Sequence, residues 1–350
     1  MGKTRNVLLA LVLVTGCSGN PFIDAPDPGP GPGPGPGTDP GTGISRDGLP
    51  PGTASPTPDR SIVRREAKTP EGNGYAEGFV YDSVADTFSV DGLAFDGGNV
   101  YQRGEQVGSL GPFAVYEADS TYADSVTGTP IDQLLHRAIF GVSTSGNTEF
   151  AIVRTGSYIP YGFGGFIYQR NGEVTLPVTG QATYSGDYAA TRDFEGRGGI
   201  EYATGQMTID IDFEDFNAST GVYPGGVKGV VTDRVIFDVT GQDITNDVLS
   251  ALNIELGSSL SSMPVLAFTI GPGVLDRNGE IIGNVGSNIV LPTGTEQYET
   301  GQYYAVISGD ATRGAQDEIV GIIVVESEDP RFENVTVRET GGFIVYRARD

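Results

Sequence analysis

Apolar and polar residues alternate strictly along one short segment of the chain, Met207–Phe213, which reads MTIDIDF. Met207, Ile209, Ile211 and Phe213 fall on one face of an extended strand, and a threonine and two aspartates fall on the other. Successive side chains of a strand point to opposite faces, so the pattern is typical of an antiparallel strand with one buried and one solvated face. Similar runs follow at Arg234–Val239, Val265–Ile270, Gln302–Ser308, Glu318–Glu326 and Gly342–Ala348. The second half of the chain is therefore predicted to consist mainly of antiparallel strands.

The first half contains six or seven shorter segments of the same type, with a less regular pattern. A turn-rich stretch, Asn171–Thr179, separates the halves, and we predict two β-rich domains, 60–175 and 176–350. One helix-like segment stands out at Thr245–Leu260, where Thr245 is a candidate cap. The residues of that segment that would share an apolar face are Val248, Leu249, Leu252 and Leu256.

The N-terminus has the three zones of a secretory signal in residues 1–16: Lys3 and Arg5, an apolar run, and two small residues. The run is shorter than the roughly 20 residues that a spanning helix needs. Cys17, the chain's single cysteine, follows in a VTGC sequence that resembles a bacterial lipobox. The resemblance implies cleavage before Cys17 and acylation of its sulfur and amino group, palmitate included. Ser18 fits retention in the outer membrane. The alternative is an ordinary cleaved signal with an incidental cysteine.

Residues 17–59 carry a Pro/Gly-rich stretch with alternating Gly-Pro from Pro28 to Gly37. Proline offers no backbone donor, glycine is entropically costly to order, and little apolar surface is available, so we expect a disordered tether. At about 3.1 Å per residue, about 35–40 residues of it would span on the order of 110 Å when fully extended.

The net charge is −24, and cleavage of the signal would remove two further positive charges. Nucleic acid is excluded as a partner because its binding is driven by basic side chains. The negative charge indicates that the exported protein is soluble and has no charged partner. The alternative is that it binds a basic partner. After lipidation of Cys17 no cysteine remains, so a disulfide cannot form.

Two segments carry a resemblance to a known family. Leu176–Phe216 contains a G-x-A-x-Y-x-G strand (Gly180, Ala182, Tyr184, Gly186), and Gln302–Ser327 contains an E-[IV]-x-G strand (Glu318, Ile319, Gly321). In order and spacing they resemble hairpins of the barrel in transferrin-binding protein B-like surface lipoproteins. The resemblance covers Leu176 to about Arg347. It implies an all-β fold, with a C-terminal antiparallel up-and-down β-barrel of about eight strands preceded by a smaller handle domain. The chain has room for one such lobe rather than two, so no ligand identity carries over.

Catalytic and metal-binding residue types are scarce. His136 is the one histidine, no G-x-S-x-G segment accompanies it, and a structural role is favoured. Asp210, Asp212, Glu214 and Asp215 raise a calcium hypothesis, but alternate residues on one strand face lie about 6.6–6.8 Å apart, so a solvated face is favoured. We expect no cofactor and no metal.

The aromatic stretch Tyr158–Arg170 is the candidate ligand contact. Its five rings are Tyr158, Tyr161, Phe163, Phe166 and Tyr168. Exposed on a loop they would suit protein binding. Alternatively they pack the core of the first domain.

We therefore predict a monomeric, lipid-anchored outer-membrane lipoprotein, exposed at the cell surface, with the periplasmic face as the alternative. It would act as a non-catalytic binding module for a protein or a small nutrient ligand, with an outer-membrane receptor as a further partner. A structural or stress-protective lipoprotein without a specific ligand is the alternative function, and an envelope hydrolase is the third.

Overall fold

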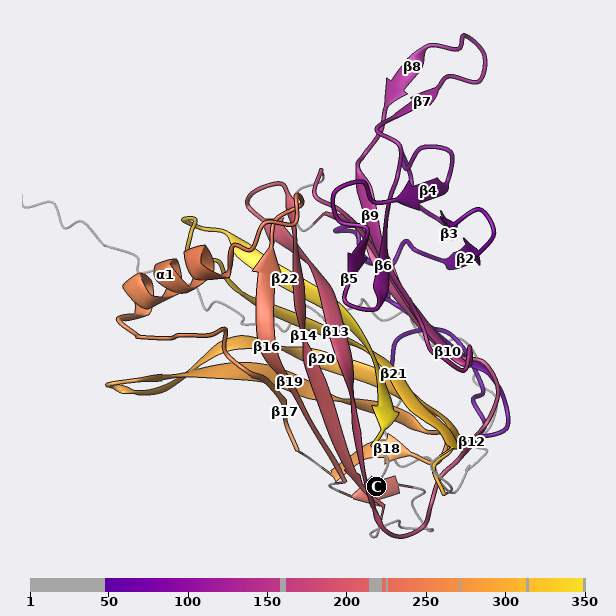
Figure 1. The fold of residues 1–350 in the computed structure, drawn as a ribbon, viewed down its shortest axis with the longest axis vertical. Helices are drawn as coiled ribbons and strands as arrows, with labels where there is room; N and C mark the ends of the chain where they lie inside the picture. The colour runs from indigo at the N-terminus through magenta and orange to yellow at the C-terminus, as the bar shows by residue number, and fades with distance from the viewer. Residues whose placement is uncertain are drawn as a thin grey trace, which may run out of the picture. The chain divides into compact units, whose positions relative to one another are not determined.

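The computed structural model describes residues 48–157, 162–213, 222–224, 226–270, 272–312 and 315–348, and all of them belong to one compact unit. Cys17 and most of the predicted tether lie outside the described residues. The fold is all-β, with one α-helix among the described residues (Figure 1).

Eight strands close into an antiparallel barrel. Around the barrel each strand pairs with its neighbours along the chain, and the last strand, β22, pairs with the first, β13. The eight are β13 (Gln181–Glu195), β14 (Ile200–Asp212), β16 (Val227–Phe237), β17 (Leu266–Phe268), β19 (Glu280–Leu291), β20 (Gly294–Asp310), β21 (Ala315–Glu328) and β22 (Thr336–Arg347). Three short strands flank them: β12 (Val174–Thr175), β15 (Val222–Pro224) and β18 (Pro272–Asp276). The predicted up-and-down barrel of about eight strands is confirmed.

The inward side of the barrel follows the period-two pattern. Met207, Ile209 and Ile211 are each at most 1% exposed, whereas Asp210 and Asp212 on the same strand are half-buried. Cross-strand pairing fixes this register, since Ile209 lies opposite Tyr184 of β13. A shift of one residue would turn the aspartates inward, so the burial of one face specifies the pairing.

Aromatic rings lie over glycines in the barrel lumen and fill it. A Cβ atom added at Gly341 would lie 2.2 Å from the ring of Tyr188, and one added at Gly229 would lie 2.4 Å from the ring of Phe268. The rings of Phe343 over Gly321 and Tyr303 over Gly283 repeat the arrangement. The lumen is therefore occupied by the protein's own side chains, as expected for a barrel of this strand number.

One end of the lumen holds a buried cluster of alternating charges, which we call the barrel-end cluster. Its members are Glu299, Arg234, Glu339, Arg192 and Glu201 from the strands, and Arg331 and Asp329 from the loop between β21 and β22. Each strand member is at most 6% exposed. No pattern in the sequence predicted this cluster.

Arg234 is the centre of the barrel-end cluster. Its two terminal nitrogens donate to both carboxylate oxygens of Glu299, at 2.8 and 2.7 Å, and one of them donates to Glu339 at 2.7 Å. Burial alone would lower the pKa of Arg234, but the two carboxylates raise it well above its ordinary value. Burial likewise opposes the charge of Glu339, yet Arg234 and Arg192 bring the pKa of Glu339 below its ordinary value. The side chains therefore stay charged inside the barrel.

The helix α1 (Thr245–Leu256) lies between β16 and β17 and ends four residues before the predicted segment does. Of the four residues predicted for its apolar face, Val248, Leu249 and Leu252 are buried and Leu256 is half-buried. The predicted cap was wrong. The cap position is Ile244, without a side-chain hydrogen bond, and the Thr245 hydroxyl instead accepts from the Ile236 amide of β16 at 2.8 Å. Among the described residues, none of the helical segments is long and apolar enough to cross a membrane.

A second, nine-stranded sheet precedes the barrel and is called the N-terminal sheet. Its strand order is β1-β11-β10-β9-β6-β4-β3-β2, with β5 paired to β6. The strands are β1 (Ile62–Arg65), β2 (Gly78–Asp82), β3 (Thr87–Asp91), β4 (Val100–Arg103), β5 (Ser109–Leu110), β6 (Phe113–Glu117), β9 (His136–Val142), β10 (Thr148–Thr155) and β11 (Phe163–Arg170). The change of sheet falls between β11 and β12.

The N-terminal sheet packs on the outer face of the barrel. Phe150 and Ile152 of β10 share one apolar cluster with Ile322 and Ile344 of the barrel. The ring of Phe150 lies over Gly342 of β22, where an added Cβ atom would be 2.2 Å from it. A buried bidentate pair between Arg64 of β1 and Glu280 of β19, at 2.6 and 3.0 Å, completes the contact.

Candidate binding surface

The predicted aromatic contact is only partly accessible. Phe166 and Tyr168 of β11 are 3% and 1% exposed, and the ring of Phe166 stacks on Tyr304 of the barrel with centroids 6.0 Å apart. These two rings belong to the core, which corrects the prediction that they contact a ligand. Their inward direction follows from the strand, because β11 lies between β1 and β10 and has one face against the barrel.

Phe163 is half-buried, and its ring stacks on Tyr75 with centroids 4.6 Å apart. Tyr158 and Tyr161 lie outside the described residues, and Cys17 does as well. The prediction of ligand contact by Tyr158 and Tyr161 therefore stays a prediction.

His136 is fully buried at the start of β9. Its Nδ1 lies 3.0 Å from the carbonyl oxygen of Leu134, and its ring packs against Tyr101 and Phe163. Burial lowers the pKa of His136 to about 4, against a weaker opposing effect of the Leu134 carbonyl. The side chain is therefore neutral near pH 7 and is enclosed by other side chains, which fits a structural role.

The acidic residues of β14 are engaged in surface contacts. Asp210 accepts from the Thr183 hydroxyl at 2.8 Å and lies 3.8 Å from Lys228, and Asp212 accepts from Gln181 at 2.9 Å. Glu214 and Asp215 lie outside the described residues. In the ranges that the structure describes, there is no group of three or more histidine, cysteine or acidic side chains placed to hold a metal ion.

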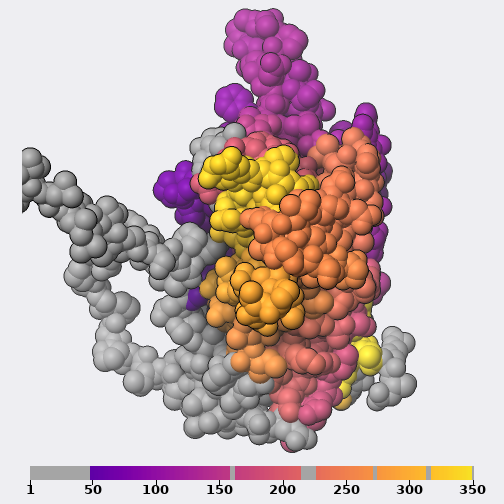
Figure 2. Space-filling view, turned by 90° about the vertical axis from the view of Figure 1, so that its left-hand side faces the viewer, coloured from indigo at the N-terminus to yellow at the C-terminus, as the bar shows by residue number. Residues whose placement is uncertain are grey.

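A projecting hairpin next to the N-terminal sheet carries several exposed apolar side chains. This arm consists of β7 (Thr121–Ala123) and β8 (Pro130–Asp132), which pair only with each other and have all six residues exposed. Figures 1 and 2 both show it standing clear of the remaining protein. Tyr122 and Ile131, 49% and 40% exposed, lie directly opposite each other, so they share one face.

The tip of the arm is held by its own turn. Oδ1 of Asp124 accepts from the amides of Val126 and Thr127 at 2.8 and 2.6 Å, and these hydrogen bonds hold the pKa of Asp124 below its usual value. The Asp124 amide donates to the Thr129 carbonyl at 2.8 Å. Val126 is thereby presented at the tip with 90% of its surface exposed.

Phe95 extends the apolar surface at the base of the arm. It is 61% exposed and has a φ of 56°, a left-handed conformation that is costly for a bulky residue. Its carbonyl accepts from the Leu134 amide at 2.7 Å, directly after the arm, and holds the two segments together. We call Phe95, Tyr122, Val126 and Ile131 the arm patch.

The surroundings of the arm patch are acidic. Residues 119–133 contain three aspartates and no basic side chain. An exposed group of large apolar side chains on a supported projection is a common feature of protein-binding sites. These residues were not predicted from the sequence. The sequence offered only one weak indication of the arm, an apolar residue on each side of a Gly-containing turn. Each of the two strands has three residues, which is too short for a periodicity to be detected.

Comparisons with known proteins show only a distant similarity between this structure and solved structures. No protein family and no curated protein sequence matches the chain. A structure of the vaccine antigen transferrin binding protein B (TbpB) double mutant from Haemophilus parasuis Hp5 is similar, with 12% identity, 83% of this chain and 52% of that chain covered, and a TM-score of 0.35.

Two further structures are similar, at the same or a lower TM-score. Intact Ap-TbpB, with N and C lobes, has 12% identity, 75% and 42% coverage and a TM-score of 0.34. A putative outer membrane protein from Bacteroides fragilis NCTC 9343 has 11% identity, 81% and 88% coverage and a TM-score of 0.21. The chain spans about half the length of the TbpB chains it matches. At these values no family is assigned.

Proposed function

We propose that this chain is an outer-membrane lipoprotein, anchored through acyl chains on Cys17 and exposed at the cell surface, that acts as a monomeric, non-catalytic binding module for a protein partner. The arm patch is the observation that carries the proposal. Four large apolar side chains are exposed on the arm and at its base, and such exposure is common in surfaces that bind other proteins. The filled lumen favours a protein partner over a small nutrient held inside the barrel.

The lipobox-like sequence and the Pro/Gly tether support the location. A body on a flexible arm keeps a high local concentration near a receptor in the same membrane while reaching outward. An enzyme acting on a diffusing substrate would gain little from such a tether. The buried, neutral His136 also favours a non-catalytic role, because it is the one histidine of the chain.

Replacement of Cys17 by serine tests the anchor. We expect the Cys17→Ser protein to lose metabolic labelling by palmitate and to accumulate unprocessed, because the acylated sulfur is gone. Labelling and membrane fractionation of cells making either protein measure this. A Cys17→Ser protein that is still cleaved and still sediments with membranes would exclude the lipoprotein assignment.

A photo-crosslinking amino acid at position 126 of the full chain tests the arm patch in native cells. We expect a discrete crosslinked product that disappears when Tyr122 and Ile131 are both changed to serine, with the affinity lowered by about ten-fold or more. Both side chains are exposed, so the free energy of unfolding should change by no more than about 0.5 kcal/mol.

Val290 provides the matched control for the arm patch, because it is 79% exposed on β19, outside the N-terminal sheet. A crosslinker at position 290 should give no such product. Equal products from both positions, or none from position 126, would favour a structural envelope lipoprotein without a specific ligand.

We propose Tyr158, Tyr161 and Phe163 as a second contact of the same partner. Changing Tyr161 and Phe163 together to alanine is expected to weaken the crosslink at position 126 without unfolding the chain. Circular dichroism of the double variant checks the fold. If the variant is unfolded, these rings are part of the core and the contact is confined to the arm patch.

A further inference from the structure

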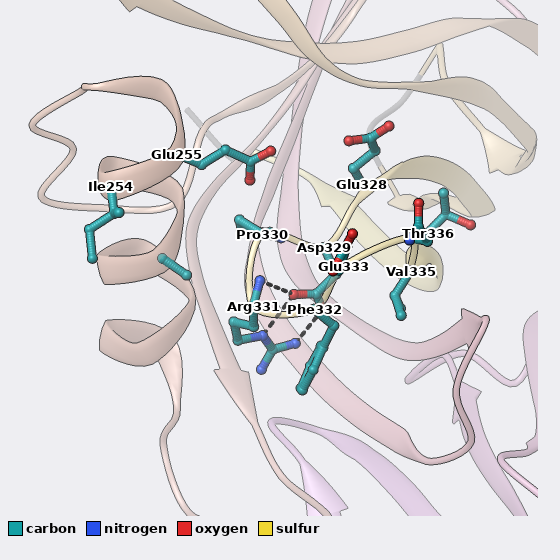
Figure 3. A pocket seen from close by; sticks show the side chains of 12 residues that line it. Ile254, Glu255, Glu328, Asp329, Pro330, Arg331, Phe332, Glu333, Val335 and Thr336 are labelled. Carbon is teal, nitrogen blue, oxygen red and sulfur yellow. Dashed lines mark hydrogen bonds and ion pairs between the residues drawn. The ribbon is translucent and has the colours of Figure 1, made fainter.

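A cavity of about 750 Å³ lies between α1 and the loop that joins β21 to β22 (Figure 3). Ala251, Ile254 and Glu255 line it from the helix, and residues 328–336 line it from the end of β21, the loop and the start of β22. The volume is in the range of cavities that hold small ligands or a few residues of a peptide. None of these residues belongs to the arm patch, and Asp329 and Arg331 also belong to the barrel-end cluster.

The loop wall of the cavity is a fixed structure. The carboxylate of Asp329 is buried and accepts from the Arg331 amide at 3.0 Å, and the Asp329 amide donates to the Val335 carbonyl at 2.9 Å. The Phe332 amide donates to the Asp329 carbonyl at 3.1 Å. The cavity is therefore formed before any ligand arrives.

Among the described residues that line the cavity, Arg331 is the one cation, and its charge is already engaged in ion pairs. It contacts Asp329 at 2.6 Å and Glu201 of β14 at 2.9 Å. Those two carboxylates raise the pKa of Arg331 even though burial opposes the charge. Arg331 is thus the outermost cation of the barrel-end cluster and leaves little positive charge for the cavity.

The charge count of this end of the barrel is unbalanced. The barrel-end cluster contains four carboxylates and three guanidinium groups, which alternate from Glu299 to Asp329. Beyond it the alternation stops, because the next charged groups that line the cavity are Glu255, Glu328 and Glu333. Within the described residues none of these three glutamates has an ion-pair partner. In Figure 3 the side chain of Glu255 reaches from α1 toward the end of β21, which carries Glu328.

We propose that this cavity binds a primary ammonium or guanidinium group carried on an aliphatic stem. The cation would lie between Glu255 and Glu328 and continue the alternation of charge outward from Asp329 and Arg331. The stem would pack on Ala251 and Pro330, which line the same cavity. A lysine or arginine side chain of a protein and a free polyamine share this chemistry.

Binding of two fluorescently labelled probes to the full chain in detergent tests the proposal. One probe is the tripeptide Arg-Leu-Arg with blocked ends, and the other is spermidine. For at least one probe we expect saturable binding that weakens by about ten-fold or more when Glu255 and Glu328 are both changed to glutamine. Both glutamates are exposed, so the variant should fold. The probe that binds more tightly identifies the source of the cation.

Two controls separate a site from general attraction to an acidic protein. Glu296→Gln removes an exposed glutamate of β20 that does not line the cavity, and binding should change by less than about two-fold. Citrulline in place of both arginines of the tripeptide keeps the shape without the charge and should weaken its binding by about ten-fold. Binding of neither probe, or equal loss in the Glu296→Gln and the double variant, would overturn the proposal.

Discussion

Replacing Ile211 with aspartate is expected to lower the free energy of unfolding by about 4 kcal/mol, because it places an unpaired carboxylate among apolar side chains of the barrel lumen. Ile211 is 1% exposed and belongs to the same apolar cluster as Ile209, Phe213 and Tyr303. Urea denaturation followed by far-ultraviolet circular dichroism measures the change. Tryptophan fluorescence is not an option, since the chain has no tryptophan.

Asp212→Lys on the same strand is the matched control. Asp212 is half-buried on the outer face, so the reversal of charge should change the free energy of unfolding by no more than about 0.5 kcal/mol. If Asp212→Lys were the more damaging change, the inward face of β14 would be the opposite one, and the predicted register would be wrong by one residue.

Arg234→Leu is expected to cost about 3–5 kcal/mol, because it leaves Glu299 and Glu339 as buried carboxylates that have lost their shared cation. The cost should shrink as the pH falls. In the native protein the pKa of Glu339 is below its ordinary value, so Glu339 contributes stability above that value and loses it on acidification. Without Arg234 the pKa of Glu339 rises. Protonation of Glu339 then removes the unpaired buried charge of the variant at a higher pH than Glu339 would protonate in the native protein.

The triple change Arg234→Leu, Glu299→Gln and Glu339→Gln distinguishes a lost contact from an unbalanced charge. Removing both carboxylates with the cation should recover most of the stability, since replacing a whole buried ionic group is often close to neutral. Urea denaturation at about pH 7.5 and about pH 5 provides the comparison, in the range where an unperturbed carboxyl begins to protonate. A triple variant no more stable than Arg234→Leu at either pH would mean that shape rather than charge holds this end of the barrel.

The barrel could be predicted because its strands are long and one-sided. In β14 the inward positions from Met207 to Ile211 are apolar and the outward Thr208 and Asp210 are polar, so local periodicity and tertiary burial agree. The strands of the N-terminal sheet were harder to predict. β10 packs with both faces covered, and its run from Phe150 to Thr155 is buried throughout, which removes the alternation.

The candidate site was largely unpredictable for two physical reasons. Phe166 and Tyr168 lie near glycines in the sequence, which suggested an exposed aromatic loop. Whether their rings are buried depends on which face of β11 packs against the barrel, and the local sequence does not determine that. The barrel-end cluster depends on contacts between residues as far apart as Arg234 and Glu339, which share one end of the lumen only after closure of the barrel. Tyr122 and Ile131 gave no periodic signal, since each lies in a strand of three residues.

The rings that lie over glycines in the lumen also restrict which substitutions this sequence can accept during evolution. Gly341 cannot gain a side chain while Tyr188 keeps its ring, because the new Cβ atom would be 2.2 Å from it. Each such pair can change only by two substitutions, and a single one passes through a strained intermediate. Interior positions should therefore exchange in complementary pairs along a lineage, whereas the arm and the loops accept single changes. Descendants of one ancestral barrel can then differ widely in what they bind and still keep the same strands.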